Sequence, residues 1–332
     1  MSTGTEQPPF ASDLRQLPKA HLHLHLEGAA RRSTLAELAH RRGVPEADLN
    51  GYDDLTGFVA AYESARDLIG SLDELRRVAR EVAEDALTQG CVWTEVHLSP
   101  WTYAGRLGPE DAVLEAVISG LTEPQRDDTG AAVILGINRA HGVEPAVELV
   151  QLAERYATSG VVGIGLVGDE RHPGRTYTEV FQRVHEVGLK AVPHAGETRG
   201  PSAVTEALEV LHADRIGHGI SATSQPGLLE ELAERDVCLD VCPTSNLRLG
   251  VVQDWESHPI HRLVSAGVTV SLNSDDPTFF GADVLDEYRT AAEHGLPIAA
   301  IAADSLHHSA APERVRVSAL AALDVHLGDA AP

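Results

Sequence analysis

The chain has 332 residues, of which 43% are hydrophobic and 23% charged, enough for a sizeable core and too apolar for a wholly disordered protein. Its 50 acidic residues outnumber the 26 basic ones and give a formal net charge of −24, which disfavours nucleic acids and anionic membrane surfaces as partners. This length corresponds to two small domains or to one large α/β barrel.

The start of the chain and its cysteines predict a cytoplasmic protein. The first residues, MSTGTEQPPFASD, contain neither a basic nor an apolar segment, so no secretory signal is predicted. No run approaches the roughly 18 apolar residues of a membrane span. We expect the three cysteines, Cys91, Cys238 and Cys242, to be buried thiols in a reducing compartment. Residues 1–16 are interpreted as a flexible N-terminal segment and residues 17–325 as one domain.

Short β-rich runs alternate with longer helical stretches along the chain. Helical stretches include residues 72–87 and 226–234. Strands that alternate with helices form parallel sheets, and eight such units predict a single (β/α)8 TIM barrel. The predicted strands are 20–26, 91–98, 132–138, 161–167, 189–194, 215–218, 237–242 and 268–273.

Polar residues gather where these strands end. Barrel enzymes build their active sites from the carboxyl ends of the strands and the loops that follow, so we expect these residues to share one site. In chain order the strand-end sequences are HLHLEG, EVHLSP, GINRAHG, LVGDE, PHAGE, IGHG, VCPTSN and LNSDDP.

The first predicted strand alternates histidine with leucine. Period-2 alternation predicts that His21, His23 and His25 share one face of the strand. Three buried imidazoles without a metal or carboxylates would cost desolvation, and histidines two residues apart on a strand can share one cation. The pattern therefore indicates a metal site.

Further candidate ligands end other strands, namely His194, His218, Asp275 and Asp276. Imidazoles with one carboxylate and an open position for water are typical of catalytic zinc, although iron or manganese would accept the same donors. Zinc would lower the pKa of its water towards ~7. The alternative is structural: the two aspartates could cap a helix before Pro277, and His218 could be a packed strand end.

Six motifs follow one another along the chain: LPKAHLHLHLEGA, GDE, HAGE, RIGHG, CPTSN and SLNSDDP. In this order they resemble the adenosine deaminase family of the amidohydrolase superfamily, from residue 17 to about residue 312. The resemblance implies a (β/α)8 barrel with one Zn²⁺ per chain and a small purine nucleoside as substrate. No lysine occurs in residues 161–170, where two-metal amidohydrolases carry one, so a one-metal site is expected.

The resemblance implies a role for each matching residue. The implied zinc ligands are His23, His25, His194 and Asp275. The implied catalytic residues are Glu197, which protonates purine N1, His218, which orients and deprotonates the attacking water, and Asp276, which faces N7. The implied substrate contacts are His25, Glu27 near the ribose, the Gly168 N–H at N3, and Asp276.

The chemistry of deamination supports the role of Glu197 independently. Hydroxide adds to an electron-rich ring carbon, so protonation of the adjacent nitrogen must offset the incoming charge. A carboxylic acid with a raised pKa can do this, and Glu197 lies three residues after His194. The strand end can then bind metal while the following turn presents the acid.

Residues 53–67 predict a helix that begins after the first strand. Leu55, Phe58, Val59 and Tyr62 follow the i, i+3, i+4, i+7 spacing of one apolar face. This face could pack in the core. The resemblance suggests instead an apolar lid over the substrate pocket, and we retain the lid as the hypothesis.

These observations predict a zinc-dependent hydrolytic deaminase of a 6-aminopurine nucleoside, with adenosine and water giving inosine and ammonia. The H-x-E and P-C-x-x-C signature of cytidine-type deaminases is absent. Because Glu27 replaces the usual Asp, adenine and 5′-modified adenosines such as aminodeoxyfutalosine stay open as substrates. A non-catalytic nucleoside-binding barrel is the other alternative, and retention of the whole ligand and acid–base set argues against it.

Overall fold

The structure is a computed structural model that describes residues 14–50, 52 and 55–329, without the side chains of 55, 56 and 326–329. Of the predicted N-terminal segment, residues 1–13 lie outside the described part of the chain. Leu14 is described and is only 7% exposed. The boundary at residue 16 stays a prediction.

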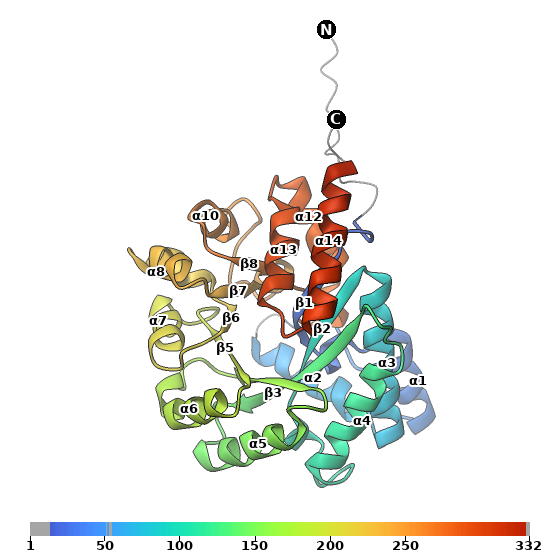
Figure 1. Ribbon diagram of the computed structural model, residues 1–332. Helices are drawn as coiled ribbons and strands as arrows, with labels where there is room; N and C mark the ends of the chain where they lie inside the picture. Colours follow the sequence, from blue (N-terminus) through green and yellow to red (C-terminus); the bar gives the residue numbers. More distant parts are fainter. Residues whose placement is uncertain (1–13, 51, 53–54, 330–332) are drawn as a thin grey trace.

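Eight parallel strands form one sheet in the order β1 to β8, with helices around it, which confirms the predicted TIM barrel (Figure 1). Strands predicted at 91–98, 161–167 and 215–218 have those bounds, and the ends of the other predicted strands differ by at most two residues. The strands are β1 (Lys19–His25), β2 (Cys91–Leu98), β3 (Gly130–Asn138), β4 (Val161–Val167), β5 (Lys190–Ala195), β6 (Arg215–His218), β7 (Cys238–Val241) and β8 (Val270–Leu272).

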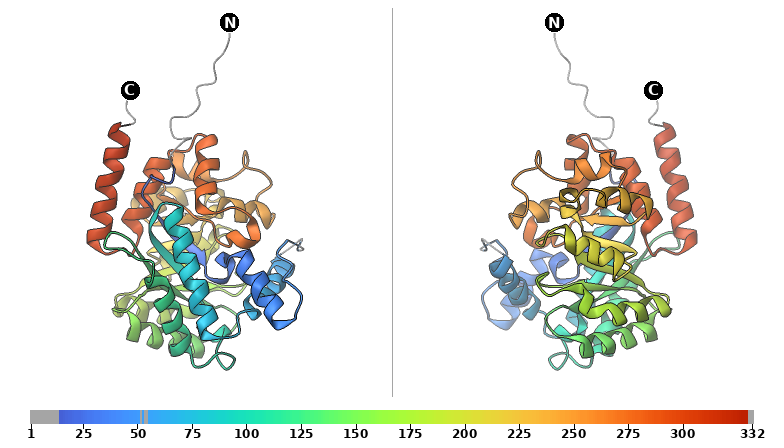
Figure 2. Two further views of the ribbon diagram at one scale, coloured as in Figure 1. Left: turned by 90° about the vertical axis from the view of Figure 1, so that its right-hand side faces the viewer. Right: turned by 90° about the vertical axis from the view of Figure 1, so that its left-hand side faces the viewer.

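Helices lie on the outside of the barrel, and α14 runs beside α13 along one flank (Figures 1 and 2). The helices predicted at 72–87 and 226–234 are present as α3 and α8. The α-helices are α1 (Arg32–Arg42), α2 (Leu55–Asp67), α3 (Leu72–Thr88), α4 (Glu110–Thr122), α5 (Val143–Tyr156), α6 (Thr178–Glu186), α7 (Pro201–Glu209), α8 (Leu228–Glu234), α9 (Pro243–Arg248), α10 (Ile260–Ser265), α11 (Pro277–Phe280), α12 (Val284–Glu293), α13 (Ile298–His308) and α14 (Glu313–Asp329). Four short 3₁₀ turns are η1 (Glu27–Ala29), η2 (Pro100–Thr102), η3 (Gly174–Tyr177) and η4 (Ile220–Ser224).

The barrel closes between β8 and β1 through a side chain as well as through backbone. Asn273 Oδ1 accepts hydrogen bonds from Leu22 N at 2.7 Å and His23 N at 3.0 Å. Beyond it, His25 N donates to Asp275 O at 3.0 Å and Asp275 N donates to His23 O at 3.1 Å. The closing seam therefore places Asp275 directly beside two of the strand histidines.

A fully buried ion cluster occupies the interior of the barrel nearer the amino ends of the strands. Arg215, the first residue of β6, contacts Asp240 of β7 at 3.0 Å and Glu95 of β2 at 2.6 Å, and all three side chains are 0% exposed. Arg215 Nη1 also donates to His308 O at the end of α13, at 3.0 Å. The cluster thus connects β2, β6 and β7 to α13.

Apolar side chains from the strands and the helices pack around the barrel, and the three cysteines are buried and free, as predicted. In the described part of the chain, no helix combines the length and apolar character needed to cross a membrane.

Candidate active site

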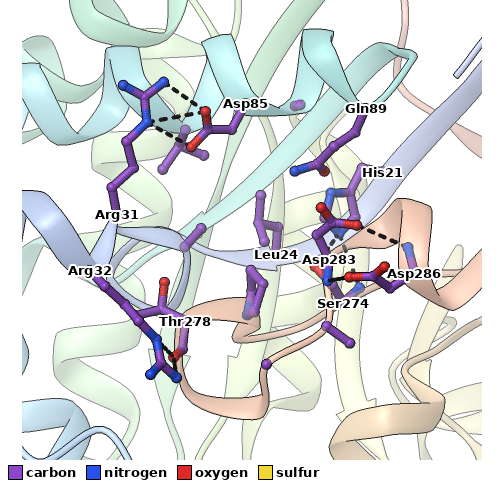
Figure 3. A pocket seen from close by; sticks show the side chains of 16 residues that line it. His21, Leu24, Arg31, Arg32, Asp85, Gln89, Ser274, Thr278, Asp283 and Asp286 are labelled. Atoms are coloured by element: carbon purple, nitrogen blue, oxygen red, sulfur yellow. Dashed lines mark hydrogen bonds and ion pairs between the residues drawn. The ribbon is translucent and has the colours of Figure 1, made fainter.

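The histidines of β1 do not share one face. The pairing of β1 with β2 shifts register between His21 and Leu24, which breaks the simple alternation. His21 and Leu24 line a separate cavity of about 310 Å³ together with Gln89, which follows α3, and Asp283 (Figure 3). The prediction that His21 shares a face with His23 and His25 is therefore wrong, because a register shift reverses the direction of the side chains that precede it.

The four predicted zinc ligands lie together at the carboxyl ends of β1, β5 and β8. Donor atoms of His23, His25 and His194 lie within 4.8 Å of one another. Asp275 Oδ1 lies 3.3 Å from Nε2 of His23 and 3.3 Å from Nε2 of His25. Segments that are up to 252 residues apart in the chain (His23 to Asp275) thus form one donor cluster.

Two of these three histidines are held in the neutral form that binds a metal. Burial holds the pKa of His23 below its usual value, and its Nδ1 finds no hydrogen-bond partner among the described residues. Burial and the neighbouring imidazoles hold the pKa of His194 well below its usual range. For His25, burial is outweighed by the carboxylates of Asp276 and Asp275, which raise its pKa to about 9, so metal binding there would release a proton.

Asp275 is held in one orientation. Ser245 Oγ donates to its Oδ2 at 2.7 Å, which leaves Oδ1 facing His23 and His25. Its backbone adopts a left-handed conformation with φ of 59°, which is costly for a residue other than glycine and is common at functional sites. Although burial opposes ionisation, hydrogen bonds from the two histidines hold the pKa of Asp275 well below its usual range. Neutral imidazoles and an ionised carboxylate are the donor set that a divalent cation requires.

The predicted acid and base stand side by side next to this cluster. Glu197 Oε1 lies 3.6 Å from His218 Nδ1 and accepts a hydrogen bond from Asn246 Nδ2 at 3.3 Å. Burial raises the pKa of Glu197, which favours its neutral form. His218 has a left-handed φ of 62° and its side chain is 1% exposed. This arrangement places a protonated carboxyl group and an imidazole side by side, so that both can reach the same reactant.

Asp276 points into the same interior. It occupies the N-cap of α11, yet its side chain makes no capping hydrogen bond, and its Oδ1 finds no partner among the described residues. A Cβ at Gly28 would come within 1.7 Å of this oxygen, so only glycine fits there. Burial and the neighbouring Asp275 raise the pKa of Asp276 well above its usual range.

The predicted substrate contacts are distributed around this centre. Glu27 is 4% exposed and accepts a hydrogen bond at 2.7 Å from the hydroxyl of Tyr62, a residue of α2. Phe58 is also buried, whereas Val59 is 45% exposed because it lies about 100° around the helix from Phe58. Gly168 follows β4 with a φ of 91°.

The helix predicted at 53–67 is present as α2. Residues 53 and 54 and the side chain of Leu55 lie outside the described part of the chain. The hydroxyl of Tyr62 and the ring of Phe58, which stacks on Phe280 at 5.2 Å, connect α2 to the interior.

Several polar residues that contact the site had no role assigned from the sequence. Ser245 and Asn246 follow β7 on α9 and bond Asp275 and Glu197. His97 is 1% exposed, lies with its ring 5.0 Å from that of His23, and has two unpartnered ring nitrogens among the described residues. The CPTSN and EVHLSP strand ends contained the signal for these residues, because polar side chains at a strand end reach the site.

The family described as adenosine deaminase matches residues 18–324, nearly the whole chain. The chain belongs to the adenosine deaminase family. A Streptomyces coelicolor protein provisionally named adenosine/adenine deaminase is 39% identical to it, over 94% of this chain and 97% of its own. An aminodeoxyfutalosine deaminase of Streptomyces avermitilis is 37% identical, over 87% of this chain and 85% of its own.

Two solved structures are similar to this chain over nearly their whole lengths. An adenine deaminase from Arthrobacter aurescens has a TM-score of 0.86 and 28% identity, covering 94% of this chain and 99% of its own. An amidohydrolase from Burkholderia ambifaria, with bound Zn, has a TM-score of 0.89 and 26% identity, covering 99% of this chain and 95% of its own.

Proposed function

We propose that the protein is a zinc-dependent hydrolytic deaminase of a 6-aminopurine nucleoside, with adenosine and water converted to inosine and ammonia. One observation carries the proposal: three imidazoles and an ionised aspartate converge beside a buried carboxyl group whose pKa is raised. Membership of the adenosine deaminase family supports the same reaction class.

His23, His25, His194 and Asp275 would hold one divalent ion per chain. Their buried, largely neutral imidazoles and single oriented carboxylate fit that role, and the bound Zn of the Burkholderia ambifaria amidohydrolase supports zinc as the ion. When bound, zinc supplies the Lewis acidity that makes hydroxide available near neutral pH.

Glu197 and His218 would move the protons. Because Asn246 Nδ2 donates to Oε1 of Glu197, the proton of the neutral acid rests on Oε2, from which it can pass to purine N1. His218 directs Nδ1 towards Glu197, which leaves Nε2 to accept a proton from the attacking water. One water proton would pass to His218 as the water oxygen bonds to C6 and the Glu197 proton passes to N1. His218 would then protonate the amino nitrogen and the C6 hydroxyl proton would return to Glu197, so that the C6–N6 bond breaks and releases ammonia and the 6-oxo product.

The remaining contacts would orient the purine. N7 can only accept a hydrogen bond, so we assign Asp276, with its free Oδ1, as the protonated donor to it. The N–H of Gly168 would reach N3, and His25 and Glu27 would border the sugar. The apolar side of α2, with Phe58, would cover the base as a lid, and its Tyr62 would fix the position of Glu27.

The choice among purines rests on Glu27. Its carboxylate already accepts the Tyr62 hydroxyl, so a ribose hydroxyl would have to share or replace that hydrogen bond. The alternative substrates are adenine, which has no ribose, and a 5′-modified adenosine, which carries a different group near Glu27. Relatives named adenine deaminase and aminodeoxyfutalosine deaminase support these alternatives.

The test is a substrate panel with the purified, metal-analysed protein. Adenosine, adenine, 5′-deoxyadenosine and aminodeoxyfutalosine are compared by kcat/KM, with ultraviolet detection of the 6-oxo product and an assay for ammonia. We expect about one equivalent of zinc and the highest kcat/KM with adenosine. Binding without turnover of any member would favour a non-catalytic nucleoside-binding barrel, and the absence of a stoichiometric metal would contradict the proposal.

A further inference from the structure

A buried carboxylate outside the assigned catalytic set holds the loop that carries Glu197. Glu170 lies three residues after β4 and is 4% exposed. Its Oε2 accepts hydrogen bonds from Gly196 N at 2.8 Å and Arg199 N at 3.3 Å. Its Oε1 accepts from Glu197 N at 2.9 Å and Thr198 N at 3.4 Å.

These four N–H groups need such a partner. β5 ends at Ala195 and α7 begins at Pro201, so the backbone between them lacks the regular hydrogen bonds of either element. Gly196 has a φ of 76°, and alternating backbone handedness turns successive N–H groups towards one point, which forms an anion-binding cup. Hydrogen bonds to an ionised acceptor are about twice as strong as neutral ones. Glu170 therefore fixes the backbone of residues 196–199 more firmly than water would.

The position of this loop decides where the Glu197 carboxyl group lies. The backbone N–H of Glu197 is one of the four donors, and its side chain reaches Asn246 and His218 from that fixed point. The other side of the same strand end is held by Arg139, whose Nη2 donates to His194 O at 2.5 Å. The loop thus connects the third histidine of the metal cluster to the acid.

We propose that Glu170 is a positioning residue for the reaction: it acts through the backbone of residues 196–199 to hold Glu197 in reach of the substrate. The role rests on the proposed function, because it gives Glu197 its task. Displacement of a reacting group by about 1 Å can cost about 100-fold in rate, so the effect of losing the cup falls mainly on kcat.

Glu170→Gln tests this with little change of shape. Either orientation of the new amide places an NH₂ group against two backbone N–H donors, so half of the cup is lost. We expect kcat to fall about 10- to 100-fold, with KM and zinc content within about twofold of wild type. Glu170→Asp keeps both acceptor oxygens on a shorter side chain and should retain more activity than Glu170→Gln.

Glu206→Gln is the matched control. Glu206 is another buried carboxylate nearby, 6% exposed, and it contacts Arg175 at 3.1 Å and Arg199 at 4.0 Å through their side chains. Its Oε1 also accepts from the backbone N–H of Arg175, but Glu206 makes no hydrogen bond to the N–H groups of 196–199, whose acceptor is Glu170. If Glu206→Gln lowers kcat as much as Glu170→Gln, a general loss of buried charge explains the effect and the proposal is overturned.

A double variant separates action through Glu197 from an independent effect. In a Glu197→Gln background the acid is already absent, so adding Glu170→Gln should lower the residual kcat less than twofold. A further loss as large as that in wild type would contradict the proposal. Should Glu170→Gln fail to fold, Glu170→Asp takes its place in the same cycle.

A crystallographic comparison does not depend on turnover. In Glu170→Gln we expect residues 196–199 to move and the contact of Glu197 Oε1 with Asn246 Nδ2 to break, while His23, His25 and Asp275 stay in place. An unmoved loop overturns the positioning role. If the wild-type protein turns over no 6-aminopurine, the proposed function fails, and this structural arm still decides whether Glu170 holds Glu197.

Discussion

Buried polar and charged side chains are paired at one end of the barrel interior and lack partners at the other end. Towards the amino ends, Arg215 is paired with Glu95 and Asp240, and each carboxylate accepts a further hydrogen bond, from Trp93 Nε1 at 2.9 Å and from Ser271 Oγ at 2.8 Å. Towards the carboxyl ends, ring nitrogens of His23, His97 and His194 and one oxygen of Asp276 find no hydrogen-bond partner among the described residues. Because burying an unpaired polar group is costly, the paired end indicates stability and the unpaired end indicates binding.

The two ends are nevertheless connected. Asp240 accepts from Ser271 Oγ, which in turn accepts from Asn273 Nδ2 at 2.8 Å, and Asn273 Oδ1 accepts from His23 N. The paired end therefore supports the strand that carries the first metal histidine. Substitutions at the unpaired end should therefore lower activity, and substitutions at the paired end should lower stability.

Replacing a histidine at the unpaired end should have the largest effect. We expect His23→Ala to lose both the bound metal and turnover by orders of magnitude, because it removes a central donor of the cluster. His21→Ala is the control: it lies two residues away, faces the separate cavity and should keep the metal. Metal analysis and kcat/KM measure both, and a metal-free His21→Ala variant would mean that His21 is a ligand after all.

Glu197→Gln should remove turnover and leave the metal. The amide keeps the size of the side chain and cannot donate the acidic proton, so we expect kcat to fall about 100- to 10,000-fold with zinc content unchanged. Steady-state kinetics at matched zinc content check this. Near-normal turnover would remove Glu197 from the mechanism.

The gathering of polar residues at this end of the barrel could be predicted from the sequence, because strand–helix alternation brings the carboxyl ends of the strands together. The resemblance to the family, and not the alternation, implied which of these residues would hold a metal. The orientation of His21 could not be predicted, since the register shift in β1 depends on its pairing with β2 and β8. Glu170, Ser245 and Asn246 lay within quoted motifs, but their roles depend on contacts with residues 27 to 49 positions away. Such contacts become visible only when the strands are placed side by side.

At the paired end, Arg215→Met should affect stability first. It leaves Glu95 and Asp240 buried without their counter-ion, which should cost about 3–5 kcal/mol of unfolding free energy. The matched control is Arg183→Met, which breaks an exposed pair with Glu154 and should cost less than about 1 kcal/mol. Urea unfolding compares the two, and equal losses would contradict the distinction between the buried cluster and a surface pair.

Glu287 tests whether every unpaired group at the carboxyl end is catalytic. It is 0% exposed, its Oε1 accepts from Thr244 N at 3.0 Å, and its Oε2 finds no partner among the described residues. Burial raises its pKa to about 8, above the usual value of 4.5. Between about pH 4.5 and about pH 8 the folded state therefore holds a proton that the unfolded state releases. The contribution of this group to the unfolding free energy falls as the pH rises through that range, by at most about 1.4 kcal/mol per pH unit.

Glu287→Gln removes this titration while keeping the acceptor for Thr244 N. The unfolding free energy of the variant minus that of wild type should increase from pH 5 to pH 8, and kcat at neutral pH should stay within about twofold. Urea unfolding at the two pH values, with kinetics on the same samples, measures this. A pH-independent difference would mean that Glu287 is ionised in the folded protein. A large loss of kcat would place Glu287 with the catalytic groups, and burial without a hydrogen-bond partner would then indicate function throughout this end of the barrel.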